Sequence, residues 1–114
     1  MKPILFFVLC IFICSGCAAS SVSELKSNPG YKKSVYTKHG YQEALKIVKD
    51  EFANNCTVFP DMKIGECTSA TAHGYYFIVT TKYIDETSSQ VDFYTAVNNS
   101  LWKERINSIV AKLQ

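Results

Sequence analysis

The sequence predicts an α+β fold, a two-layer sandwich in which two amphipathic helices pack on one face of an antiparallel β-meander. Residues 75–84 are dense in aromatic and β-branched side chains, which favour a strand. Residues 41–52 and the segment from about residue 100 onward repeat apolar side chains at helical spacing. Each helix must bury its apolar stripe, and one face of an antiparallel sheet provides the surface.

The first part of the domain is expected to contain one strand and one helix. A short strand covers residues 34–38, and His39-Gly40 ends it. In the helix that follows, Ala44, Leu45 and Val48 share one face, while polar side chains occupy the remainder. We interpret this apolar stripe as part of the core.

The second part is predicted to be a four-strand meander followed by the last helix. Turn-forming residues at 60–63, 73–74 and 85–89 separate its strands. Asn98, Asn99 and Ser100 are candidate N-caps of the helix. The whole order is β-α-β-β-β-β-α, with meander strands at residues 57–59, 65–71, 75–84 and 90–97.

Alternation along residues 75–84 divides their side chains between two faces. Tyr75 and Phe77 are assigned to the face that the helices cover, and Tyr76 and Ile78 to the opposite face. Tyr94 falls on that same outward face of the next strand. If the helices cover only one face, these residues and Ile84 form an exposed patch suited to a protein partner, with Tyr76, Ile78 and Tyr94 as the candidate contacts. The alternative is that the sheet curls or that the tether or the first strand covers them.

The start of the chain carries a leader pattern. Lys2 precedes an unbroken apolar run over residues 4–14, which is shorter than the ~20 apolar residues that span a bilayer. Cys14-Ser15-Gly16-Cys17 follows, and this arrangement resembles the signal sequence and lipobox of bacterial lipoproteins. The resemblance implies that Cys17 becomes the acylated first residue, bearing palmitate-type chains that enter the bilayer. Cys14 stands where that family usually has leucine.

Other fates of the leader remain open. Ordinary signal peptidase could cut near residues 16–19, which are small, and a retained membrane anchor is a further alternative. Under the lipoprotein interpretation, Ala18 rather than aspartate follows the lipid site, which in that family implies the outer membrane, facing the periplasm. The expected organisation is a signal peptide over residues 1–16, a lipidated cysteine with a flexible tether over 17–31, and one domain over 32–114.

Cysteine usage agrees with export to an oxidising compartment. Once Cys10 and Cys14 leave with the leader and Cys17 carries lipid, Cys56 and Cys67 remain. We expect them to form a disulfide across a hairpin. No metal site is expected, because the only histidines, His39 and His73, lie far apart in the sequence and a zinc site would need more ligands.

No pattern in the sequence indicates catalysis or nucleic-acid binding. The formal net charge is +2, and loss of Lys2 with the leader lowers it further, so no nucleic-acid partner is expected. The sequence contains neither a nucleophile elbow nor a Gly-rich phosphate loop. We therefore expect no enzymatic activity and no cofactor.

These features favour an envelope lipoprotein that acts as an accessory or binding subunit through protein–protein contacts. The alternative is a periplasmic inhibitor or immunity protein directed against a lysozyme or a delivered toxin. A small hydrolase or a binder of cell-wall fragments ranks third, because no nucleophile–base pair can be named.

Overall fold

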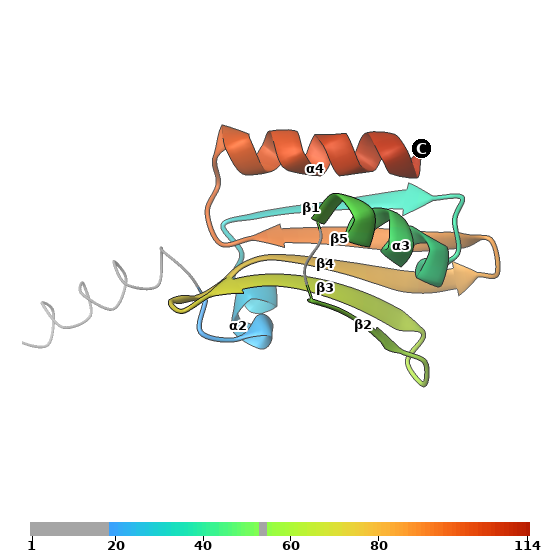
Figure 1. Ribbon diagram of the computed structural model, residues 1–114, viewed down its shortest axis with the longest axis horizontal. Helices are drawn as coiled ribbons and strands as arrows, with labels where there is room; N and C mark the ends of the chain where they lie inside the picture. The colour runs from blue at the N-terminus through green and yellow to red at the C-terminus, as the bar shows by residue number, and fades with distance from the viewer. Residues whose placement is uncertain (1–18, 53–54) are drawn as a thin grey trace, which may run out of the picture.

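The computed structural model describes residues 19–52 and 55–114 and has the expected α+β architecture (Figure 1). Five strands form one antiparallel sheet in the order β1-β5-β4-β3-β2, so β1 and β2 are its edges. The meander prediction is confirmed for β2 to β5, and β1 pairs with the free side of β5. The strands are β1 (Tyr31–Thr37), β2 (Asn55–Phe59), β3 (Ile64–Thr71), β4 (Gly74–Asp85) and β5 (Ser88–Thr95).

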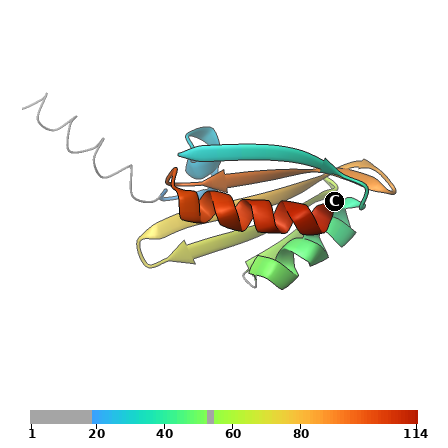
Figure 2. The ribbon, with the colours of Figure 1, turned by 90° about the horizontal axis from the view of Figure 1, so that it is seen from above.

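Two helices, α3 (Tyr41–Phe52) and α4 (Ser100–Leu113), cover one face of this sheet, as predicted (Figures 1 and 2). Of the three candidate caps of α4, Asn99 is the N-cap, and its Oδ1 accepts a hydrogen bond of 2.9 Å from the backbone N–H of Trp102. The other end of α4 is tied to β1, because Thr37 Oγ1 donates a 2.6 Å hydrogen bond to the Leu113 carbonyl.

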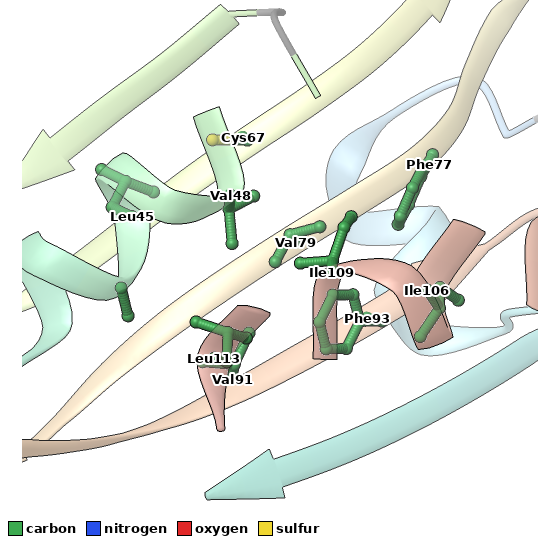
Figure 3. Packing of buried hydrophobic residues seen from close by; sticks show 11 residues of the cluster. Leu45, Val48, Cys67, Phe77, Val79, Val91, Phe93, Ile106, Ile109 and Leu113 are labelled. Carbon is green, nitrogen blue, oxygen red and sulfur yellow. The ribbon is translucent and has the colours of Figure 1, made fainter. Parts of the chain in front are cut away.

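The main core lies between these helices and the sheet (Figure 3). The two apolar stripes predicted for the helices meet there and close over the sheet side chains. Burial of one large aliphatic or aromatic side chain contributes about 1.5–3 kcal/mol, so this cluster supplies most of the stability. Its buried members are Ala44, Leu45, Val48, Cys67, Phe77, Val79, Val91, Phe93, Ile106, Ile109 and Leu113.

Close packing of α3 requires a glycine in β3. A Cβ atom on Gly65 would lie 2.6 Å from Thr81 Oγ1 and 2.8 Å from Leu45 Cδ2. Both distances are shorter than any ordinary contact, so a larger residue would require the side chains of Leu45 and Thr81 to move. Beside it, Cys56 and Cys67 are directly opposite each other in the β2–β3 register and form the predicted disulfide.

A third helix, α2 (Val22–Ser27), was not predicted and lies on the opposite face of the sheet (Figure 1). The flexible tether expected over residues 17–31 is therefore wrong for its described part. Ala19 forms an isolated bridge with Tyr75, with backbone hydrogen bonds of 3.1 and 2.8 Å. The folded domain thus includes Ala19 and does not begin at residue 32.

The predicted leader (residues 1–16) and Cys17 lie outside the described residues. Within the ranges that the structure describes, no helix is long and apolar enough to cross a membrane.

Candidate interaction surface

The predicted contact patch of Tyr76, Ile78 and Tyr94 is not an exposed surface. Ile78 is completely buried, Tyr94 is nearly so, and Tyr76 is half-buried. The cover is α2, because its buried Leu25 joins Ile78 and Tyr94 in a second apolar cluster. The prediction was wrong for these residues because it treated residues 17–31 as a flexible tether. The structure instead agrees with the alternative, in which this segment covers them.

Helix α2 has a local sequence signal at its start. Ser21 is its N-cap, and Ser21 Oγ accepts a 3.1 Å hydrogen bond from the backbone N–H of Glu24. The Glu24 carboxylate in turn accepts from the backbone N–H of Ser20 at 3.1 Å and from the Ser20 hydroxyl. These hydrogen bonds lower the pKa of Glu24. Serine followed three residues later by glutamate is the pattern of a capping box, which marks the start of a helix.

A β-bulge explains why Tyr75 lies on the α2 side and not on the predicted one. Ser69 pairs with Phe77, but the next residue of β3, Ala70, pairs with Tyr75, which leaves Tyr76 as an extra residue of β4. One extra residue reverses the alternation beyond it. Tyr75 therefore packs against the cluster beneath α2, while Phe77 stays in the main core.

Beyond α2, the same face of the sheet has a polar centre built on Asp92 of β5. The Asp92 side chain is completely buried. Its Oδ1 accepts a 2.8 Å hydrogen bond from Gln90 Nε2, and Lys82 Nζ lies 3.1 Å from Oδ2 as an ion-pair partner. Burial alone would raise the pKa of Asp92, but the hydrogen bonds from Gln90 and Ser34 and the nearby Lys82 outweigh it and lower that pKa.

The charge of Asp92 also acts on its neighbours. The hydrogen bond to Asp92 raises the pKa of Lys82, and burial, followed by the carboxylate charge, raises the pKa of Tyr94. Two lysine ammonium groups make cation–π contacts with the Tyr94 ring. Lys32 Nζ lies 5.2 Å and Lys26 Nζ 5.9 Å from the ring centroid.

Lys26 of α2 also forms an ion pair with Glu66 of β3. Thr80 Oγ1, on the neighbouring strand β4, lies 3.4 Å from the same Glu66 Oε2. The Lys26–Glu66 ion pair therefore joins α2 to strand β3 of the sheet.

The uncovered half of this face presents a row of side chains that crosses all five strands, which we call the open row. The pairing registers align its members one opposite the next. Tyr36, at one end, is 70% exposed, and Ile84, which follows two residues after Lys82 in β4, is 47% exposed. The open row consists of Tyr36, Gln90, Lys82, Ile64 and Phe59.

Two shallow grooves flank the open row. One, of about 710 Å³, is lined by Tyr36 and Ile84 together with the C-terminal Leu113 and Gln114. The other, of about 470 Å³, separates α2 from the β2–β3 hairpin, and its apolar lining includes Phe59, Met62 and Ile64. Exposed apolar side chains around a lysine are suited to a protein contact more than to enclosure of a small molecule.

Comparison with protein-family models and with curated proteins finds no match for this chain. In the part of the chain that the structure describes, no three His, Cys, Asp or Glu side chains gather closely enough to hold a metal ion.

Proposed function

We propose that this protein is a lipid-anchored lipoprotein of the bacterial cell envelope, placed on the periplasmic side of the outer membrane, and that it acts as a non-enzymatic binding subunit. Acylated Cys17 is the anchor, and the open row is the contact surface for an envelope protein. The observation that carries the binding role is the exposure of Tyr36 and Ile84, which line the same groove. Clustered exposed apolar side chains mark contact sites.

The composition of the open row supports a protein partner. Aromatic side chains are enriched in protein interfaces, and Tyr36 and Phe59 stand at its two ends. Lys82 in the middle is held toward Asp92, so it keeps its position before a partner arrives. A surface whose side chains are already ordered loses less conformational entropy on binding.

The anchor is tested by mass and by fractionation. Intact protein from native membranes is expected to begin at Cys17 with two or three acyl chains attached. The Cys17→Ser variant is expected to lose the acyl mass and to leave the membrane fraction. An unacylated mass that begins near Ala19 would contradict the anchor.

The contact surface is tested by site-specific photocrosslinking in whole cells. A photoreactive amino acid in place of Tyr36 or Ile84 is expected to give one discrete adduct with an envelope protein. The matched control is Val58, which is also an exposed apolar strand residue but pairs with Gly65 and so lies on the α3 side of the sheet. Equal adducts from Val58, or none from Tyr36 and the neighbouring Ile84, would exclude the open row and the groove beside it as the contact.

A further inference from the structure

The chain between the proposed lipid site and the folded domain is very short. Cys17 and Ala19 are separated only by Ala18, and Ala19 is already hydrogen-bonded to Tyr75 in the sheet. Two residue steps span at most about 7 Å. The headgroup layer on each side of the hydrocarbon core is about 5–8 Å thick. A lipid-bound Cys17 would therefore hold this end of the sheet at the membrane surface.

The same end of the domain collects several elements. The β3–β4 turn, the start of β1 and the start of α4 lie together there, and Ala19 joins the sheet beside them (Figure 1). Two backbone hydrogen bonds connect these elements. Gly30 N–H donates to the Thr95 carbonyl at 2.8 Å, and Ala96 N–H donates to the Tyr76 carbonyl at 2.9 Å. We call this the Ala19 end.

Side chains at the Ala19 end have the chemistry of a membrane interface. Leu101, in the first turn of α4, is 72% exposed, the highest value among the large apolar side chains of the described residues. Next to it, Trp102 is half-buried against Phe77, and Lys103 Nζ lies 5.1 Å from the centroid of the Tyr31 ring. Tryptophan, tyrosine and lysine are the residues that favour the headgroup layer.

The charge at this end suits anionic headgroups. This end has three lysines and two acids, so the net charge of this group is positive. The lysines are Lys32 and Lys33 of β1 and Lys103 of α4, and the acids are Glu24 and Glu104. The opposite end of the sheet has Asp85 and Glu86 beside the β4–β5 turn, together with Lys38 after β1.

We infer that the Ala19 end docks on the surface of a phospholipid bilayer that contains anionic lipid, with Leu101 in the headgroup layer and the sheet directed away from the membrane. This inference rests on the proposed anchor at Cys17. It places the open row toward the distal half of the domain, where an envelope partner can reach Tyr36 and Ile84.

The inference is tested with single-tryptophan variants of the full lipidated protein, because the chain has one tryptophan. The double variants Trp102→Phe/Leu101→Trp and Trp102→Phe/Glu86→Trp place the probe at the Ala19 end and at the opposite end. Tyr75 and Asp85, the residue before Glu86, are about 33 Å apart along β4 at the usual strand rise. Each variant is reconstituted into phosphatidylethanolamine–phosphatidylglycerol vesicles with brominated acyl chains, which quench only nearby tryptophans.

We expect the Leu101→Trp probe to lose most of its emission and the Glu86→Trp probe to lose none. Native Trp102 in the unmodified protein is expected to be quenched in part, which provides a measurement that needs no substitution. Failure to float with the vesicles would overturn both the anchor and this inference. Flotation with equal quenching at the two positions, or with none at Leu101→Trp, would overturn the orientation alone.

Discussion

The ammonium nitrogen of Lys82 lies 3.1 Å from Oδ2 of Asp92, a carboxylate that is completely buried on the sheet face that α2 partly covers. Lys82 is the ion-pair partner of Oδ2, and hydrogen bonds from Gln90 and Ser34 also compensate the buried carboxylate. A buried carboxylate without a compensating partner is costly. This pair therefore links the stability of the sheet to the surface that we propose for binding.

Removal of Lys82 should destabilise the fold. The Lys82→Met variant leaves Asp92 without its ion pair, and we expect the free energy of unfolding to fall by about 1–3 kcal/mol. The loss stays below that of a fully buried pair because the Lys82 side chain is 45% exposed. Urea unfolding measures the change, and Lys46→Met on the exposed side of α3 is the control, with an expected effect within about 0.5 kcal/mol.

The double variant Lys82→Met/Asp92→Asn separates the ion pair from general packing. Once the buried charge is gone, replacing Lys82 should cost less than it does in the native background. Additive effects of the two substitutions would show that the two side chains act independently.

The lowered pKa of Asp92 should make stability depend on pH in the acid range. In the folded protein the carboxyl holds its proton less readily than in the unfolded chain, whose aspartates titrate near ~3.9. The stabilisation is therefore present above the unfolded pKa and is lost as the pH falls through the lower folded pKa. Urea unfolding should be measured from neutral to acid pH for the native protein and for Asp92→Asn. The difference between their free energies of unfolding should shrink as the pH falls, and a difference that stays constant with pH would contradict this role.

Reduction of the disulfide should weaken the β2–β3 hairpin and the packing of α3. Cys56 and Cys67 are separated by 11 residues in sequence, and closing a loop of this size is worth about 3 kcal/mol or less. Addition of reductant should lower the unfolding midpoint of the native protein by a corresponding amount. The variant Cys56→Ala/Cys67→Ala is the control, because reductant should not change its midpoint.

Truncation of Leu25 should release α2 from the sheet while the main core stays folded. Leu25 is the buried anchor of a six-residue helix, and its removal leaves a cavity over Ile78 and Tyr94. We expect Leu25→Ala to speed hydrogen exchange at the amides of α2 and to leave that of Val79 protected. Ser23→Ala, on the exposed side of the same helix, should change neither, and global loss of protection in Leu25→Ala would contradict a local role.

The long elements could be predicted because their patterns repeat over many residues. The stripe of Ala44, Leu45 and Val48 and the dense strand around Phe77 each identify one element without help from the rest of the chain. Asn99 was one of three neighbouring polar candidates for the N-cap, and the choice depends on the chain path into α4. Local patterns therefore predicted which segments are helices or strands more accurately than the residues at which they begin and end.

The α2 face was beyond this kind of prediction for three physical reasons. Helix α2 is too short to show periodicity, so only the capping box from Ser21 to Glu24 marked it. The bulge at Tyr76 breaks the alternation on which the placement of Tyr75 depended. The burial of Asp92 depends on side chains from neighbouring strands, such as Lys82, and sequence does not supply their register.

The sheet is also protected from adding further strands at either edge. Edge strand β1 carries Lys32 and Lys33 in succession, so lysine charge is present on both of its faces. Edge strand β2 is only five residues long and is followed at once by Pro60. Charged side chains, short strands and proline are the features that keep sheet edges from pairing between molecules. Proteins tethered to one membrane reach high local concentrations, and these edges would keep neighbouring copies from aggregating through their sheets.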